Sequence, residues 1–219
     1  MIGARLPAII FDCDGVLVDS EFLASRVESE VLRDLGLDLT IDEVHDLFLG
    51  KTVERVLDLI GERVGARPGA GFTYNWAFAT AFAFMRELKP VAGIRAALEE
   101  FAGRGHRMAV ASQSPIARVR MSLAVTGLER FFGDDICVTS MVARPKPAPD
   151  IYLFAAARLG AAPGDCVVIE DSPAGAAAAM SVGMRAIGYA PGDTLAAMQA
   201  SGAEIMRSMD ELPGLLAPR

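Results

Sequence analysis

Short apolar runs alternate with longer stretches of helical periodicity over most of this chain. The runs predict buried strands at residues 8–11, 106–112, 135–140, 165–170 and 184–190. Helical patterns lie at residues 93–103, 115–126, 149–159 and 173–182. Prolines near the predicted helix starts and glycines near the helix ends are typical of such boundaries. Strands joined by helical crossovers predict an α/β fold with a parallel sheet.

Residues 20–89 break this alternation. Helical patterns run through residues 21–35, 41–47, 52–64 and 72–88, and no convincing strand is present there. We therefore predict an α/β core made of residues 1–19 and 90–219, with a helical domain at residues 20–89 inserted after the first strand. The two crossings between these domains are expected near residues 17–20 and 87–92.

An aromatic stretch, FTYNWAFATAFAF, runs from residue 72 to residue 84. At helical spacing Tyr74, Phe78 and Phe82 share one side, and Trp76 and Phe84 lie nearer another. The favoured interpretation is that these rings form the core of the helical domain or its packing surface. A cofactor-binding surface or a peptide groove is the alternative.

Charge and cysteine content narrow the classes of partner. The net charge is −7 and no segment gathers basic residues, so binding to nucleic acid or to an anionic membrane is not expected. Cys13, Cys137 and Cys166 lie in or beside apolar runs and form no CxxC pair, which predicts reduced structural thiols. No signal peptide or membrane span is evident. We expect a cytoplasmic protein, with a monomer as the default.

Polar residues follow the predicted strands at the positions where parallel sheets bind ligands. Such ligands bind beyond the carboxyl ends of the strands. Asp12 and Asp14 follow the first strand, Ser112 ends the second, and the fourth leads into Glu170 and Asp171. These side chains are therefore expected along one edge of the sheet.

A cation would explain why so many carboxylates gather at this edge. Oxygen ligands without histidine suit a hard cation, and Mg²⁺ first among them. Two like charges ~4 Å apart repel by about 4 kcal/mol at an effective dielectric constant of ~20, and a bridging divalent cation reverses the sign. Lys146, which stands between Pro145 and Pro147, would add a second positive charge at the same edge. Ser112 and the N–H groups after the second strand could hold phosphoryl oxygens.

Four short motifs together resemble those of the haloacid dehalogenase superfamily. The motifs are FDCDG, VASQS, KPAPD and EDS, in the superfamily's order, and the resemblance extends over residues 7–190. The helical domain after the first motif is similar to the superfamily's C1-type cap. KPxPD and EDSxAG are typical of its β-phosphoglucomutase-like and phosphoglycolate-phosphatase-like branch. The resemblance implies a Rossmann-like core with a helical cap.

The resemblance also implies catalytic roles for the matching residues. Asp12 would be the nucleophile that takes the phosphoryl group, and Asp14 would protonate the leaving oxygen and then activate water. Ser112 and Lys146 would bind the transferring phosphoryl group. An aspartate two residues after the nucleophile favours phosphoryl chemistry over dehalogenation, because an alkoxide leaving group needs a proton. The expected activity is a Mg²⁺-dependent phosphatase that acts on a small phosphorylated metabolite through an aspartyl-phosphate.

The metal ligands implied by the resemblance come from the same residues. Asp12, the backbone carbonyl of Asp14, and Asp171 would hold Mg²⁺, and Glu170 would contribute directly or through an intervening group. Structural pairing with Lys146 is the alternative role of Glu170.

This chain departs from the family pattern at positions that contact substrate. Gln113 follows Ser112, where a small residue or Asn is frequent, and it is a candidate substrate contact. Ala24 stands where the branch's mutases carry a cap histidine, and their cap arginine would fall near Val53. Lys51, in FLGKTVER, is a candidate substrate contact, with a solvated surface lysine as the alternative.

Two other functions stay open for the same fold. A phosphohexose mutase is the first, and the missing histidine and arginine count against it. A non-catalytic phosphate-binding module is the second, and the intact pair Asp12 and Asp14 counts against that.

A few polar residues near the motifs are expected to be structural. Ser114 is expected to cap the helix that follows it, and the alternative role of Ser112 is to form a turn or a helix cap. Cys13 should point away from the two aspartates and pack in the core. His45 and His106 are expected to be ordinary surface or turn residues.

Overall fold

A computed structural model of the protein describes residues 6–48, 51–192 and 194–217. Contacts divide the chain into two compact units. One unit takes in the chain up to Val18 and from Lys89 onward, and the other is Asp19–Leu88.

Six parallel strands form the sheet of the larger unit, in the order β3-β2-β1-β4-β5-β6. The first five strands confirm the prediction, whereas β6 is too short to stand out as an apolar run. Starting from β1, the chain fills one side of the sheet with β2 and β3 and the other side with β4 to β6. The switch point of the topology therefore lies between β1 and β4, where open α/β sheets bind ligands. The strands are β1 (Ala8–Phe11), β2 (Met108–Ser112), β3 (Ile136–Val138), β4 (Cys166–Glu170), β5 (Arg185–Tyr189) and β6 (Glu204–Met206).

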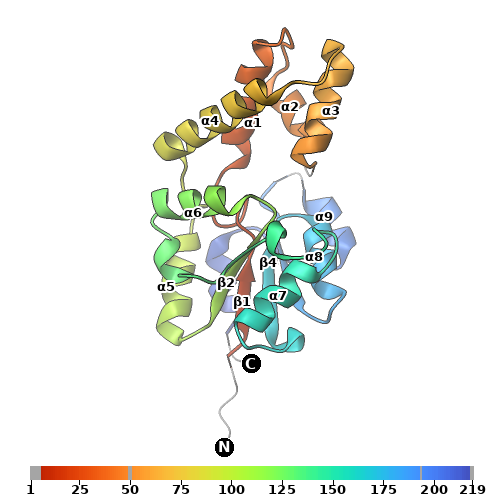
Figure 1. Cartoon of the computed structure of the whole chain (residues 1–219). Coiled ribbons are helices and arrows are strands. Elements are labelled where there is room, and N and C mark those ends of the chain that lie inside the picture. The colour runs from red at the N-terminus through yellow and green to blue at the C-terminus, as the bar shows by residue number, and fades with distance from the viewer. Residues whose placement is uncertain (1–5, 49–50, 193, 218–219) are drawn as a thin grey trace, which may run out of the picture. The chain divides into compact units, whose positions relative to one another are not determined.

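Helices cover the sheet, and Figure 1 shows α5 on the opposite side of it from α7 and α8. All four residues of β1 are fully buried, which explains why its sequence is continuously apolar and does not alternate. Ile10 and Val168 of the sheet share one core cluster with Tyr152 of α7 and Ala176 of α8. The predicted α5 to α8 are confirmed to within two residues; α9 and α10 were not predicted. The helices are α5 (Ile94–Arg104), α6 (Ile116–Val125), α7 (Asp150–Arg158), α8 (Pro173–Met180), α9 (Leu195–Ser201) and α10 (Leu212–Leu215), and the short 3₁₀ turns are Glu129–Phe131, Thr139–Met141, Pro163–Asp165 and Met209–Glu211.

The smaller unit is helical throughout its described residues, as predicted, with α1 (Glu21–Arg33), α2 (Ile41–Phe48), α3 (Val53–Val64) and α4 (Ala70–Glu87). Thr52 caps α3 by accepting a hydrogen bond from the Arg55 backbone N–H at 3.3 Å. The unit has its own apolar core, to which α1, α2 and α3 contribute and against which Phe72 and Trp76 pack: Leu32, Val44, Phe48, Val56 and Ile60.

The aromatic residues of α4 divide between two faces. Trp76 lies 6.5 Å from the ring of Phe48 in the core, and Phe84 is fully buried. Tyr74, Phe78 and Phe82 are 78%, 70% and 48% exposed. These three rings are therefore not part of the unit's core, and a packing surface or a groove is what the prediction leaves for them.

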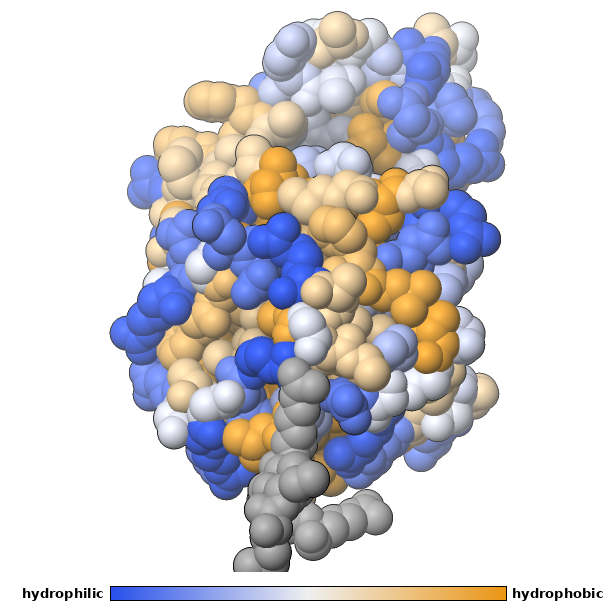
Figure 2. All heavy atoms as spheres, turned by 60° about the horizontal axis from the view of Figure 1, so that its bottom comes forward, coloured by the Kyte–Doolittle hydropathy of each residue, from blue (hydrophilic) through white to orange (hydrophobic). Residues whose placement is uncertain are grey.

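Other expectations from the sequence meet mixed outcomes. Cys13, Cys137 and Cys166 are free and buried, as expected for structural thiols. The expectation for His106 is wrong, because its ring is buried against Phe101 and its Nδ1 lies 2.9 Å from the Pro7 carbonyl oxygen. On the face drawn in Figure 2, hydrophilic and hydrophobic residues are interspersed. Within the described residues, no helix combines the length and the hydropathy that a bilayer crossing requires.

Candidate active site

The loop after β1 carries Asp12 to the switch point of the sheet. The Asp12 backbone N–H donates to the carbonyl of Ile169 in β4 at 2.9 Å, which continues the β1–β4 ladder by one residue. The chain then turns at Gly15, whose φ of 76° lies in the left-handed region that favours glycine. The Gly15 N–H closes the turn on the Val18 carbonyl at 2.9 Å. The backbone on both sides of Asp14 is thus fixed by hydrogen bonds.

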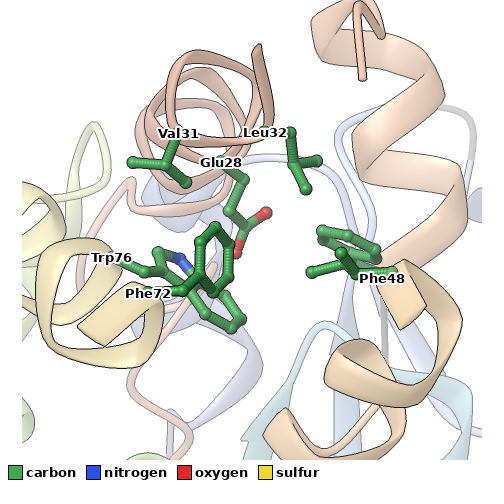
Figure 3. A pocket seen from close by; sticks show the side chains of 7 residues that line it. Glu28, Val31, Leu32, Phe48, Phe72 and Trp76 are labelled. Atoms are coloured by element: carbon green, nitrogen blue, oxygen red, sulfur yellow. The ribbon is translucent and has the colours of Figure 1, made fainter. Parts of the chain in front are cut away.

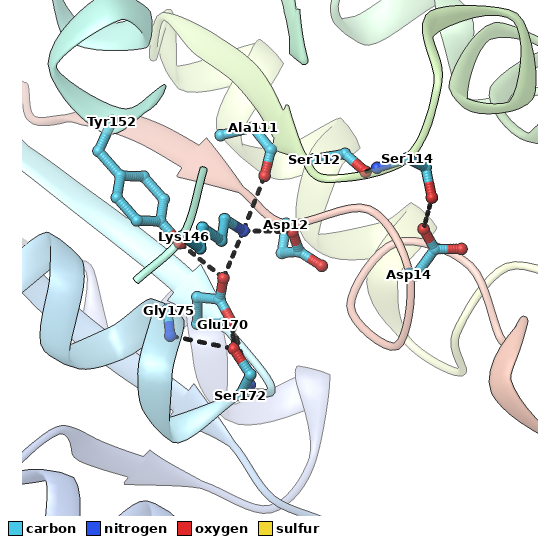
Figure 4. A network of polar contacts seen from close by, with 10 residues as sticks. All are labelled: Asp12, Asp14, Ala111, Ser112, Ser114, Lys146, Tyr152, Glu170, Ser172 and Gly175. Carbon is cyan, nitrogen blue, oxygen red and sulfur yellow. Dashed lines mark hydrogen bonds and ion pairs between the residues drawn. The ribbon is translucent and has the colours of Figure 1, made fainter. Parts of the chain in front are cut away.

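Lys146 is the centre of a buried polar network (Figure 4). Its Nζ donates to Asp12 Oδ1 and to Glu170 Oε1, both at 2.6 Å, and to the Ala111 carbonyl at 3.0 Å. The side chains of Lys146, Asp12 and Glu170 are only 6%, 12% and 1% exposed. An ammonium group has three donors, and this one uses all three within the protein. The structure thus brings together three of the residues that the sequence placed at this edge.

Glu170 is held from several directions. Its Oε1 accepts from Tyr152 Oη at 2.6 Å as well as from Lys146. Its Oε2 accepts from the Ser172 N–H at 2.9 Å and from Ser172 Oγ at 2.7 Å. A carboxylate offers about four lone-pair sites, and all four have protein donors. This arrangement favours the structural role of Glu170 over direct metal ligation.

Glycine is required where α8 passes this carboxylate. A Cβ placed at Gly175 would lie 2.1 Å from Glu170 Oε1, so no larger residue fits without displacing the glutamate. Ser172 caps the helix by accepting from the Gly175 N–H at 3.1 Å, as the Ser172-Pro173 sequence predicts. The first turn of α8 thereby fixes the glutamate that holds Lys146.

The three buried ionisable groups respond differently to the same burial. Burial raises the pKa of Asp12 to about 7, although the Lys146 ammonium opposes this rise. Burial acts in the same direction on Glu170, but Lys146 and the hydrogen bonds from Tyr152 and Ser172 outweigh it and hold the pKa below its usual value. Burial alone would lower the pKa of Lys146, but the two carboxylates hold it well above its usual value. The number of hydrogen bonds thus separates the two carboxylates, which lie equally close to Lys146.

Asp14 lies outside this network and has partners of its own. Ser114 Oγ donates to Asp14 Oδ2 at 2.7 Å, and Arg118 Nη2 donates to Asp14 Oδ1 at 3.2 Å. The prediction that Ser114 caps a helix is wrong, because α6 starts at Pro115 as its N-cap and no side chain caps it. The Ser114 N–H donates to the Oγ of buried Ser112 at 3.0 Å, so Ser112 forms the local turn that was its alternative role.

The donors at this edge fit a hard cation. A Cβ placed at Gly15 would lie 1.8 Å from Asp171 Oδ2, so the Asp171 carboxylate lies against the loop that carries Asp12 and Asp14. No three His, Cys, Asp or Glu side chains converge on one point in the described ranges. The ligand set of Asp12, Asp171 and the Asp14 carbonyl contains only two carboxylates, and Mg²⁺ commonly binds through one or two carboxylates, substrate phosphate oxygens and water.

The two remaining candidates, Gln113 and Lys51, are exposed and make no contact with the Lys146 network in the described structure. Gln113 stands in the β2–α6 connection beside Ser112. Lys51 belongs to the helical unit and precedes α3. Their proposed contacts with substrate stay predictions.

The helical unit contains a small pocket of its own (Figure 3). Apart from the Glu28 carboxylate, its lining is apolar and comes from all four helices: Val31, Leu32, Phe48, Ile60, Phe72 and Trp76. None of the strand-end residues lines it. We therefore assign the chemistry to the polar network of the α/β unit.

Three contributors to the site were not predicted: Tyr152, Arg118 and the Ser114 hydroxyl. Tyr152 stands in the apolar pattern of α7, where the sequence indicates burial but not what its hydroxyl reaches. Arg118 stands four residues after Ser114, a spacing that places both on one side of a helix start. That spacing was the available signal, and it does not reveal Asp14 as the partner.

Comparisons with known proteins place this geometry in a family. A model of haloacid dehalogenase-like hydrolases matches residues 6–183. Hexitol phosphatase B of Escherichia coli is 33% identical over 186 residues, which make up 84% of this chain and 83% of that protein. The chloroplast protein SUPPRESSOR OF QUENCHING 1 of Arabidopsis thaliana is 35% identical over 190 residues, which are 84% of this chain but only 18% of that much longer protein.

Solved structures agree with the sequence matches. A haloacid dehalogenase family hydrolase from Deinococcus radiodurans, crystallised with phosphate and sodium, superposes with a TM-score of 0.82 at 34% identity, over 98% of this chain and 96% of that one. A proposed beta-phosphoglucomutase from Thermotoga maritima gives a TM-score of 0.82 at 29% identity, over 96% and 98% of the two chains. The chain therefore belongs to the haloacid dehalogenase superfamily of hydrolases, in its β-phosphoglucomutase-like branch.

Proposed function

We propose that this protein is a Mg²⁺-dependent phosphatase that hydrolyses a phosphorylated carbohydrate. The observation that carries the proposal is the buried Asp12 carboxylate, 2.6 Å from Lys146 Nζ at the switch point of the sheet, with Asp14 two residues further on. A carboxylate beside a fixed cation can approach an anionic phosphoryl group with less repulsion than a bare one. The name of hexitol phosphatase B and the phosphate in the Deinococcus structure support this substrate class.

The reaction proceeds in two displacements at phosphorus. In the first, an Asp12 oxygen forms a bond to phosphorus, the bond from phosphorus to the carbohydrate oxygen breaks, and Asp14 gives its proton to that oxygen. In the second, Asp14 takes a proton from a water molecule that attacks the aspartyl-phosphate. Inorganic phosphate leaves, and both carboxyl groups return to their starting states.

Positive charge and hydrogen-bond donors around Asp12 hold the phosphoryl group. Lys146 lies beside Asp12, and Ser112 ends the neighbouring strand β2. Mg²⁺, held by Asp12, Asp171 and the Asp14 carbonyl, supplies further positive charge to the transferring phosphoryl group. Glu170 keeps Lys146 in place through the contacts already described, and binds no metal in this scheme.

The metal dependence is tested by removing the cation. EDTA should abolish phosphate release from p-nitrophenyl phosphate, and excess Mg²⁺ should restore it. Ca²⁺ should inhibit, because its larger and looser coordination misplaces Asp12. Asp171→Ala should weaken Mg²⁺ binding more than Glu170→Gln does, measured by activity against Mg²⁺ concentration. Activity that persists in EDTA would refute the metal dependence, and the reverse order of the two variants would refute the ligand assignment.

A mutase is the second candidate, because the Thermotoga structure carries a beta-phosphoglucomutase name. Ala24 and Val53 replace the mutases' cap histidine and arginine, which favours water as the phosphoryl acceptor. A coupled assay for glucose 6-phosphate, started from β-glucose 1-phosphate, should run at background. Inorganic phosphate should accumulate in a panel of hexitol, hexose and sugar-acid phosphates. Isomerisation faster than phosphate release would overturn the phosphatase assignment.

A further inference from the structure

We infer that Arg118 and Ser114, at the start of α6, are positioning residues for the Asp14 carboxylate. The inference rests on the proposed phosphatase function, in which Asp14 moves the proton. Ser114 Oγ reaches one carboxylate oxygen at 2.7 Å and Arg118 Nη2 reaches the other at 3.2 Å. Two donors on the two oxygens fix both the position and the rotation of the carboxylate, which a single hydrogen bond does not.

The backbone of Asp14 is already fixed, so the side chain is the only part left to orient. The turn after β1 is closed by the Gly15 N–H on the Val18 carbonyl and by the Leu17 N–H on the Cys13 carbonyl, both at 2.9 Å. Val16, Leu17 and Val18 are fully buried, which anchors the turn in the core. The donors from α6 therefore act on the one remaining freedom of this residue, its side-chain rotation.

The same segment carries a second group of the site. The Ser114 N–H donates to Ser112 Oγ at 3.0 Å while the Ser114 hydroxyl donates to Asp14. Ser114 thereby links the proposed phosphoryl-binding hydroxyl of Ser112 to the proposed proton donor. A leaving oxygen on a phosphoryl group held by Ser112 would then lie at a set distance from Asp14.

Stability of the fold does not account for the contact between Arg118 and Asp14. Their side chains are 33% and 27% exposed, and solvent screens ion pairs at that exposure, so they contribute little to folding. Arg120 on the same helix forms a similar pair with Asp134 at 3.3 Å, and the Asp134 side chain is 92% exposed. Arg120 lies outside the site and provides a matched control for Arg118.

The consequence of this role depends on the leaving group. An ester whose leaving oxygen is strongly basic needs a proton from Asp14 as its bond to phosphorus breaks, whereas a nitrophenolate leaves without one. The ratio kcat/KM reports the free enzyme and substrate up to formation of the aspartyl-phosphate, which includes departure of the leaving group. A misplaced Asp14 should therefore lower kcat/KM selectively for esters with basic leaving groups.

The test compares two small aryl esters, phenyl phosphate and 2,4-dinitrophenyl phosphate, under saturating Mg²⁺. Arg118→Met should lower kcat/KM for phenyl phosphate about 10- to 100-fold, and for the dinitrophenyl ester by less than about threefold. Arg118→Lys should recover part of the loss, because it restores one donor. Ser114→Ala removes the other donor and should show the same selectivity with a smaller loss. Arg120→Met should leave both esters within about threefold of the wild type.

Several outcomes would overturn the inference. Equal losses on the two esters would indicate a substrate anchor or a structural role for Arg118. No loss, or a loss that Arg120→Met reproduces, would show that Arg118 does not act through Asp14. A wild-type protein that hydrolyses neither ester with Mg²⁺ would refute the proposed function, and the role of Arg118 with it. Normal wild-type hydrolysis without the selective loss would refute the inference alone.

Discussion

The two units of the chain treat their charged residues in opposite ways. In the α/β unit, Lys146 and Glu170 are nearly inaccessible and bind each other and Asp12 at 2.6 Å. In the helical unit, ion pairs join exposed side chains, as between Arg67 and Asp58, which are 50% and 51% exposed. Removing charges from water costs several kcal/mol per ion even after pairing, whereas exposed pairs change stability by about 0–1 kcal/mol.

This difference separates a unit that carries reactive groups from one whose polar residues face solvent. Buried, strongly coupled charges at the ends of strands are expensive for the fold, and such groups concentrate at functional sites. The helical unit instead exposes apolar rings, among them Tyr74 at 78% and Phe78 at 70%. The comparison assigns the chemistry to the α/β unit, and leaves substrate selection as the role expected of the helical unit.

The largest expected effect comes from removing the attacking oxygen. Asp12→Asn is nearly isosteric, but it replaces a nucleophile and metal ligand with a neutral amide. Because phosphoester hydrolysis is very slow without catalysis, kcat should fall by about 10³-fold or more. Asp134→Asn, at a 92% exposed side chain of the same unit, should leave kcat unchanged. An Asp12→Asn variant that keeps a tenth of wild-type kcat would rule out the covalent mechanism.

The next effect tests the contrast in burial directly. Lys146→Met leaves Asp12 and Glu170 buried without their cation, so the free energy of unfolding should fall by about 3–5 kcal/mol. Arg67→Met breaks exposed pairs with Glu54 and Asp58 and should cost about 1 kcal/mol or less. Urea unfolding of the two full-length variants, followed by circular dichroism, gives both values. Similar losses would mean that the two units do not differ in the way the exposures indicate.

The sequence predicted the fold and the buried network because both follow from strand ends. Once five apolar runs are strands of one parallel sheet, Asp12 and Glu170 must come to the same edge, since their strands end there. The KPAPD loop brought Lys146 to that edge on the strength of the family resemblance. The sixth strand was missed because three residues, Glu204–Met206, gain their strand character only from pairing with β5.

The rest of the site depends on details that the apolar pattern does not contain. Tyr152 reaches Glu170 because α7 packs on the sheet with one particular rotation, and a change in that rotation would bury the ring without the hydrogen bond. Arg118 and Ser114 reach Asp14 only when the β2–α6 connection has its observed shape. Ser114 was misassigned for the same reason, because a serine before a proline also suits a helix cap.

The smallest expected effect concerns Lys51, the exposed residue before α3 in the helical unit. If it contacts the carbohydrate, Lys51→Ala should raise KM for the best substrate of the phosphate panel by about 3- to 10-fold, the loss of one or two polar contacts. Turnover of p-nitrophenyl phosphate should change little, because that ester lacks the carbohydrate. Lys89→Ala removes the same charge from another exposed lysine and should alter neither substrate. Equal losses on both substrates would show that Lys51 does not contact the carbohydrate, and an effect shared with Lys89→Ala would trace it to net charge.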